Sequence, residues 1–238
     1  MNFSNNKTPQ NQSQTEKVVK SWSNPEIISK KSPTCKDVLK TANLSPMMVH
    51  YCQTKTGLTD PANTILFYRL GDFYEMFFED ATLVSKELEL TLTGKDCGME
   101  DRAPMCGIPY HAAEGYINRL VENGHKVAIC EQMEDPKQAK GMVKREVIRV
   151  VTPGTTLIPQ GLDETKNNYI MSIVCMEGCF GISTADISTG QCLVTEMDKP
   201  RRLVDEITKF MPAEIICNQS FLLCGIDVED LRTRLHIC

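Results

Sequence analysis

A phenylalanine and a glutamate stand two residues apart directly after a tight turn, and together they could bind a flat polar group. Phe73 and Glu75 belong to the sequence GDFYEMFF at 71–78, which follows a run of branched and aromatic residues. Glycine tolerates the positive φ that a two-residue hairpin turn requires, so Gly71 and Asp72 predict a turn between two antiparallel strands. Side chains alternate across a strand with period two, which places the ring and the carboxylate on the same face.

Period-two alternation divides the returning strand into an apolar face and a mixed face. The apolar face, which is the natural core side, consists of Tyr74, Met76 and Phe78. The mixed face consists of Phe73, Glu75 and Phe77. In one interpretation both phenylalanines of the mixed face pack beneath a helix and the glutamate reaches solvent. In the other, Phe73 is an exposed wedge that stacks on a flat group beside a hydrogen-bonding carboxylate, as in proteins that kink DNA from the minor groove. The pattern alone leaves both open.

Periodicity, caps and turn residues predict the elements that must position this pair. Helices are expected at 46–56, 79–88, 111–123, 199–209 and 228–235. Strands are expected at 65–70, 73–78, 90–93, 126–132, 147–151, 169–175, 179–186, 189–196 and 213–217. Ser45 is the expected N-cap of the first helix and Pro46 its first residue. The stripe Ala81, Val84 and Leu88 is expected to cover the apolar face of the strand.

Five sequence blocks in one order resemble the MutS family of DNA mismatch repair proteins. The first, GDFYEMF, is similar to the Phe-x-Glu mismatch-recognition motif of that family. The others are LTLTGKD at 90–96, PMCGIPYH at 104–111, VAICEQ at 127–132 and VVTPGT at 150–155. The resemblance is dense from about 44 to 156 and looser to 238. It implies an α/β protein, with a mixed-sheet N-terminal domain with flanking helices followed by a partial RNase H-like α/β connector domain.

The resemblance also implies which side chains contact DNA. Phe73 would stack on an unpaired or mispaired base from the minor groove, and Glu75 would hydrogen-bond that base. Basic side chains would hold the phosphate backbone, and the loop with Met105 would lie near the DNA. The DNA-binding residues expected on this basis are Asp72, Phe73, Glu75, Lys95, Met105, Lys144 and Arg145. No catalytic residue is implied.

Charge gives this expectation only local support. The net charge is −5, and residues 1–46 carry seven Lys and Arg against three Asp and Glu, whereas the remainder carries 19 against 28. Outside the first 46 residues, basic side chains cluster at Lys137, Lys140, Lys144, Arg145 and Arg149. Such a cluster makes sequence-independent phosphate contacts or forms a solvated face. Composition alone would not indicate DNA.

Composition is that of a globular protein without a membrane segment. Of the 238 residues 41% are hydrophobic and 24% charged, and no apolar run approaches the ~20 residues of a membrane helix. Eleven cysteines are an odd number, several lie within apolar runs, and none forms a zinc spacing with the four histidines. A reduced, cytoplasmic protein that holds no metal is therefore expected, and the resemblance implies association with the nucleoid.

Three regions are expected along the chain. Residues 1–43 are expected to be a disordered tail, because residues 1–20 have too few apolar side chains to offset ordering entropy. A short helix within 17–40 that folds on a partner is the alternative. Residues 44–160 would form the mismatch-recognition domain and 161–238 an incomplete connector domain. The chain contains no G-x-x-x-x-G-K-[ST] phosphate loop, so it should not be an ATPase by itself. The resemblance implies ATP and Mg²⁺ only for the full-length family, with this chain an N-terminal fragment or truncated product.

The expected partners follow from the same resemblance, and two other functions stay open. Mismatched double-stranded DNA is the expected ligand, MutL the partner of the connector domain, and a homodimer the full-length assembly. One alternative is an RNase H-like metal-dependent nuclease using Asp186, although no second acid accompanies it at a telling spacing. Another is an interaction scaffold that no longer binds DNA.

Overall fold

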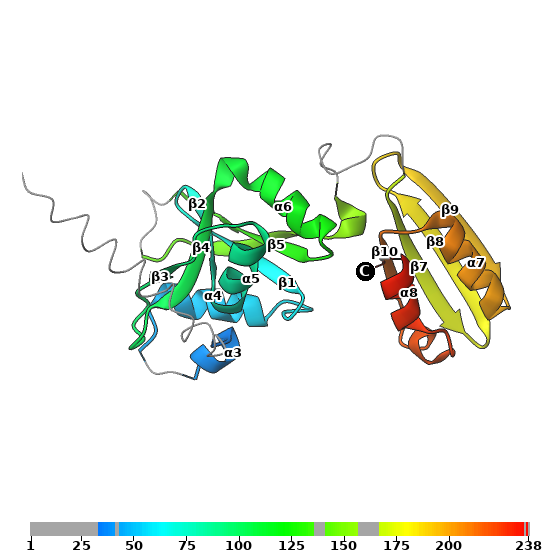
Figure 1. Ribbon diagram of the computed structural model, residues 1–238, viewed down its shortest axis with the longest axis horizontal. Coiled ribbons are helices and arrows are strands. Elements are labelled where there is room, and N and C mark those ends of the chain that lie inside the picture. The colour runs from blue at the N-terminus through cyan, green and yellow to red at the C-terminus, as the bar shows by residue number, and fades with distance from the viewer. Residues whose placement is uncertain (1–32, 41–42, 136–140, 157–166, 236, 238) are drawn as a thin grey trace, which may run out of the picture.

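The computed structural model describes residues 33–40, 43–135, 141–156, 167–235 and 237, and these residues form two β-sheets with flanking helices (Figure 1). The strand order is β3-β4-β2-β1-β5-β6 in the first sheet and β10-β7-β8-β9 in the second. The α/β class and the mixed sheet of the first unit are as predicted. Lys137 and Lys140, and the expected boundary near 160, lie outside the described residues.

The first sheet is built around the predicted hairpin. Its strands are β1 (Thr64–Leu70), β2 (Phe73–Phe77), β3 (Thr93–Lys95), β4 (Ala103–Pro109), β5 (Lys126–Gln132) and β6 (Arg145–Val151). Leu70 pairs with Phe73 across the turn, and Gly71 has φ +60°, which glycine accommodates without strain. β5 lies parallel to β1, whereas the other pairings in this sheet are antiparallel. The sheet is therefore mixed.

Helices cover both faces of this sheet. The helices of the first unit are α3 (Cys35–Val38), α4 (Pro46–Thr56), α5 (Phe78–Glu87), η1 (Tyr110–Ala112), α6 (Ala113–Glu122) and η2 (Pro153–Thr155). α5 and α6 bury one face of β2, where Tyr74 and Met76 lie in a common core with Ala81 and Val84. α3 and α4 bury the opposite face, which includes Phe77. Ser45 caps α4 through its side chain, as predicted.

A buried ion pair joins α4 to α5. Lys55 Nζ lies 2.6 Å from Asp80 Oδ1, and both side chains are almost completely enclosed. Asp80 also accepts a hydrogen bond from the Leu66 amide at 2.9 Å, and Lys55 donates one to the Thr64 carbonyl oxygen at 2.6 Å. The pair therefore ties two helices to the first strand of the hairpin.

In the part of the chain that the structure describes, the helices of the second unit lie on one face of its sheet (Figure 1). Its elements are β7 (Tyr169–Met176), β8 (Cys179–Asp186), β9 (Gln191–Met197), α7 (Pro200–Phe210), β10 (Glu214–Cys217), η3 (Phe221–Leu223) and α8 (Val228–Leu235). Met171 and Ile173 of β7 pack against Leu203 of α7 and Leu231 of α8. Val174 and Met176 alternate with them and are exposed. Within the described residues, no helix is both long enough and apolar enough to span a membrane.

Three predictions about local structure were wrong. β2 ends at Phe77, so Phe78 does not join the face of Tyr74 and Met76; it begins α5 with φ +54° and packs in the core on the α4 side. The strand expected at 90–93 begins only at Thr93, where pairing with β4 starts. Finally, α3 lies within the region expected to be a disordered tail, and its Cys35 is buried against α4.

Candidate nucleic-acid interface

Phe73 is the first residue of β2, and its ring is open to solvent. The residue is 47% exposed, whereas Phe77, on the same face, is 0% exposed. The difference arises because α4 covers only the far end of this face: the Tyr51 ring packs edge-on against Phe77 at 4.8 Å between centroids. A solvent-facing ring at the tip of a hairpin can stack on a flat group that approaches from outside.

Glu75 lies between these two phenylalanines and forms an ion pair. Its Oε2 is 2.5 Å from Nζ of Lys95, and the two side chains are 16% and 32% exposed, respectively. Gly107 is the cross-strand partner of Glu75, and a Cβ at that position would lie 3.5 Å from the Glu75 Cγ and 3.3 Å from the Tyr74 carbonyl oxygen. The carboxylate therefore lies over a glycine, with its charge partly balanced by a lysine on the sheet edge.

The other predicted residues differ in how far they face solvent. Asp72 is exposed in the turn, and its carbonyl oxygen accepts a hydrogen bond from the Tyr110 amide at 3.0 Å. Met105 is partly buried and pairs with Thr93. Lys144 is exposed and ion-paired with Glu146 at 2.7 Å.

Arg145, in contrast, is turned inward. Its Nε donates to the Arg69 carbonyl oxygen and its NH1 to the Val143 carbonyl oxygen, both at 2.8 Å. The guanidinium carbon also lies 5.2 Å from the centroid of the Tyr68 ring. Two donors of Arg145, on Nε and NH1, are thus used within the domain, and its contact with phosphate stays a prediction.

The sequence did not point to two residues at the hairpin tip, Arg69 and Tyr110. Tyr110, at the end of β4, is 45% exposed, and the guanidinium carbon of Arg69 lies 3.7 Å from the centroid of its ring. Tyr110 falls within the block PMCGIPYH, but nothing in the pattern shows that it adjoins the turn. The tip therefore carries two exposed rings, those of Phe73 and Tyr110.

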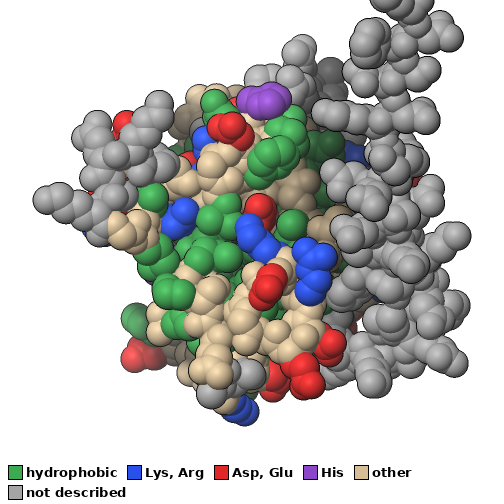
Figure 2. Space-filling model, turned by 90° about the vertical axis from the view of Figure 1, so that its left-hand side faces the viewer, with side chains coloured by type: hydrophobic (Ala, Val, Ile, Leu, Met, Phe, Trp, Pro, Cys, Tyr) green, Lys and Arg blue, Asp and Glu red, His purple; other side chains and the backbone are tan. Residues whose placement is uncertain are grey.

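Charges of both signs are mixed on the end of the molecule that Figure 2 shows. Lys and Arg side chains are scattered there among hydrophobic and acidic ones, without a continuous basic surface in this view. This agrees with the negative net charge of the chain. Attraction to phosphates is thus local on this face.

Comparison with known proteins assigns the chain to a family. The family model described as MutS domain I matches residues 45–159, and that described as MutS domain II matches residues 168–234. The chain belongs to the MutS family. It is 64% identical over 196 residues to the DNA mismatch repair protein MutS of Lachnoclostridium phytofermentans, an alignment that covers 82% of this chain and 21% of that protein. The MutS of Acetivibrio thermocellus is 55% identical over 183 residues, with 76% of this chain and 21% of that protein covered.

The chain thus spans about a fifth of the length of the curated MutS proteins it matches. The match to domain I contains the hairpin, and the match to domain II contains the second sheet. The predicted family is therefore confirmed. The roles of single residues stay predictions.

Asp186, the residue of the nuclease alternative, stabilises a turn in the domain II region of this MutS-family chain. It is buried and accepts hydrogen bonds from the Ser188 amide at 2.8 Å, the Ser188 hydroxyl at 2.6 Å and the Asn167 side chain at 2.8 Å. Burial raises the pKa of this carboxyl, but these hydrogen bonds and one from the Thr189 amide outweigh it, so the net pKa lies below its usual value. Among the described residues, no group of three or more potential metal ligands is present.

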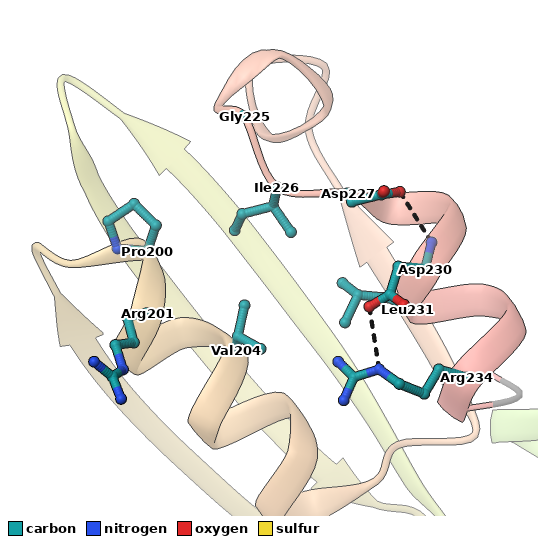
Figure 3. Close-up of a pocket in the computed structure, with 9 residues that line it drawn as sticks. All are labelled: Pro200, Arg201, Val204, Gly225, Ile226, Asp227, Asp230, Leu231 and Arg234. Atoms are coloured by element: carbon teal, nitrogen blue, oxygen red, sulfur yellow. Dashed lines mark hydrogen bonds and ion pairs between the residues drawn. The ribbon is translucent and has the colours of Figure 1, made fainter.

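A groove of about 260 Å³ lies between α7 and α8 in the same region (Figure 3). Val204, Ile226 and Leu231 are apolar side chains in its lining. Arg234 beside them is paired with Asp230, with 3.1 Å between Nε and Oδ2. The charges that line the groove are therefore partly balanced, and it shares no residue with the hairpin.

Proposed function

We propose that this chain binds mismatched double-stranded DNA through the tip of its β1–β2 hairpin. The observation that carries the proposal is the exposed ring of Phe73 beside the carboxylate of Glu75, within a region that matches MutS domain I. The relatives named above are called DNA mismatch repair proteins, which supports a DNA ligand for the same region here.

The Phe73 ring would enter from the minor groove and stack on the mispaired or unpaired base. Inserting an apolar side chain between base pairs costs about a few kcal/mol of unstacking per step. A mispaired step has already lost part of its pairing and stacking, so unstacking it requires less free energy than unstacking a paired step. This part of the selectivity would therefore come from the deformability of the DNA.

Glu75 would add a second source of selectivity. Its carboxylate would accept a hydrogen bond from the base on which Phe73 stacks. On a matched duplex no base is displaced toward it, and the negative charge only repels the phosphates. Lys95 moderates this repulsion, because its ammonium group lies 2.5 Å from Glu75 Oε2.

Backbone contacts would come from side chains that face solvent. Lys144 is exposed and its partner Glu146 is also at the surface, so exchanging that ion pair for a phosphate costs little. Arg145 would contribute only if it left the carbonyl oxygens of Arg69 and Val143. Lys144 is therefore the stronger candidate of the two.

The wider activity of the MutS family also enters as proposals for this chain. Binding of MutL through the domain II region, homodimer formation, and use of ATP and Mg²⁺ by the full-length protein are expected from the resemblance. The matched family models are those of domains I and II, so the chain itself is proposed to be a non-catalytic binding module.

The nuclease alternative gains no support from the site around Asp186. All the hydrogen bonds to its carboxylate come from its own turn and from Asn167, and they leave it poorly placed to bind paired metal ions. A scaffold without DNA binding is the remaining alternative, and a binding measurement decides it.

Equilibrium binding of the 238-residue chain to two duplexes that differ only in one mispair tests the proposal. The wild-type chain should prefer the mismatched duplex, and Phe73→Ala should remove that preference. Leu223→Ala, which truncates an exposed apolar residue of the domain II region, is the matched control and should keep it. Equal binding of both duplexes by the wild type, or an unchanged preference in Phe73→Ala, would contradict the proposal.

A further inference from the structure

The guanidinium of Arg69 contacts the turn of the hairpin and two side chains beside it. Its Nε donates to the carbonyl oxygen of Gly71 at 2.5 Å, and its NH1 donates to both carboxylate oxygens of Glu131 at 3.4 Å. The guanidinium carbon lies 3.7 Å from the centroid of the Tyr110 ring. A planar guanidinium can stack on an aromatic face while its edge donates hydrogen bonds, which an ammonium cannot do.

These contacts join side chains from neighbouring strands of the sheet. Arg69 lies on β1, and its cross-strand partner on β2 is Tyr74, whose hydroxyl also donates to Glu131. Glu131 lies on β5, and Tyr110 follows the end of β4. In the sheet order β4-β2-β1-β5, a single side chain thus connects strands on both sides of the hairpin.

The turn itself has further hydrogen-bond partners. The Gly71 amide donates to the Gln132 side chain at 2.9 Å, and the Tyr110 amide donates to the Asp72 carbonyl oxygen at 3.0 Å. Phe73 comes directly after this turn and pairs with Pro109, the residue before Tyr110. The backbone from which the Phe73 ring projects is therefore anchored by hydrogen bonds to Arg69, Gln132 and Tyr110.

We propose that Arg69 is a positioning residue that fixes the hairpin tip, and with it the ring of Phe73, before DNA arrives. This inference rests on the proposed function, because it assigns Arg69 a part in mismatch discrimination. A wedge that is already ordered does not lose conformational freedom on binding, whereas a loose tip would have to be ordered at the expense of affinity. The loss should be greatest for the mismatched duplex, where the ring is inserted.

Arg69→Lys is the decisive variant, because it keeps the positive charge and removes the planar fork and the stacking. In the free chain, amide hydrogen exchange should become roughly tenfold faster at Gly71 and Tyr110, because the variant loses both the stacking on Tyr110 and the hydrogen bond to the Gly71 carbonyl oxygen. Exchange at Ile173, in the second sheet, should not change. Arg119→Lys, a charge-conserving change on α6, is the control and should leave all three amides as in the wild type.

The same variants are then compared for binding to the mismatched and the matched duplex. Arg69→Lys should lower affinity for the mismatched duplex by about five- to tenfold and change affinity for the matched duplex less than twofold. If Arg69 instead contacted phosphate, the lysine would preserve binding to both, and Arg69→Gln would lower the salt dependence of both. That pattern would overturn the positioning role.

The two proposals fail in distinguishable ways. If the wild-type chain shows no preference for a mispair, the proposed function fails, and Arg69 has no discrimination to support even if its lysine variant loosens the tip. Unchanged exchange at Gly71 and Tyr110 in Arg69→Lys would show that the hairpin tip does not depend on the contacts of Arg69. That result would overturn the positioning role and leave the proposed function intact. Faster exchange with an undiminished mismatch preference would also overturn it, with the proposed function intact.

Discussion

Nζ of Lys95 lies 2.5 Å from Oε2 of Glu75, and both side chains are largely withdrawn from solvent. The pair engages one carboxylate oxygen, and within the described part of the chain no hydrogen-bond donor reaches Oε1. Glu75 can thus keep its lysine and still accept a hydrogen bond from a base. The ion pair also places a positive charge where the carboxylate would otherwise repel DNA alone.

Removing the charge of Glu75 should weaken discrimination by strengthening the wrong complex. Glu75→Gln keeps the shape of the side chain and frees Lys95 to attract phosphate. We expect affinity for the matched duplex to rise by roughly three- to tenfold, about 1 kcal/mol, as measured by fluorescence anisotropy of labelled DNA. Glu229→Gln, on α8, is the charge-matched control. A matched-duplex affinity equal to that of the control would refute this role.

Truncating Phe77 should lower the free energy of unfolding far more than truncating Phe73, although the two residues share one face of β2. Phe77→Ala removes a ring that is 0% exposed and should lower the free energy of unfolding by about 3–5 kcal/mol. Phe73→Ala removes a largely exposed ring and should change it by less than about 1 kcal/mol. Urea denaturation followed by circular dichroism measures both. A large loss of stability in Phe73→Ala would mean that the ring is a core residue.

The buried Lys55–Asp80 pair should make stability depend on pH. Burial raises the pKa of Asp80 to about 6, although the neighbouring Lys55 lowers it in part. In the unfolded chain the pKa of an aspartate is about 4. Between these values the folded state binds more protons, so the contribution of Asp80 to the free energy of unfolding falls as pH rises from about 4 to about 6. The fall is at most about 3 kcal/mol.

Asp80→Asn supplies the reference for that measurement, because it lacks the titrating group. The difference in free energy of unfolding between wild type and Asp80→Asn, from urea denaturation at several pH values, should decrease across this window and stay constant above it. A difference that grows with pH would show that Lys55 lowers the pKa of Asp80 below its unfolded value. Lys55→Met should cost about 3–5 kcal/mol at pH 8, because it leaves the carboxylate buried without its partner.

Asp186 should prove structural. Asp186→Ala removes the acceptor for Ser188, Thr189 and Asn167 and should lower the free energy of unfolding by about 1–3 kcal/mol at neutral pH. Since its folded pKa lies below the usual value, this contribution is present above about pH 4 and is lost as pH falls through the folded pKa.

DNA incubated with the wild-type chain and Mg²⁺ or Mn²⁺ should stay intact; cleavage that Asp186→Asn abolishes would establish the nuclease alternative.

Local signals were sufficient to predict most of the fold. The Gly-Asp turn, the Ser45 cap and the alternation of β7 and β8 are set by neighbouring residues, and these elements formed where expected. Phe78 was misplaced because period two was extended past the end of the strand, where a helix begins instead. Leu90 and Leu92 alternate like a strand, but they pack against the core without a pairing partner.

The site could be predicted only as a set of residue types. Alternation placed Phe73 and Phe77 on one face, but their different exposure depends on where α4 ends above the sheet. Arg145 was expected at the surface with its neighbours, yet the carbonyl oxygens of Arg69 and Val143 hold it inward. Such contacts join segments far apart in the chain, and no pattern within one segment reports them.

The most direct test of the wedge is an NMR spectrum of the chain, with its phenylalanine rings labelled, bound to a duplex with one mispair. If Phe73 stacks on the mispaired base, its ring protons should shift upfield and show nuclear Overhauser effects to that base, while the buried Phe77 ring should show none. A complex in which the DNA is bound but the Phe73 resonances keep their free positions would contradict the account.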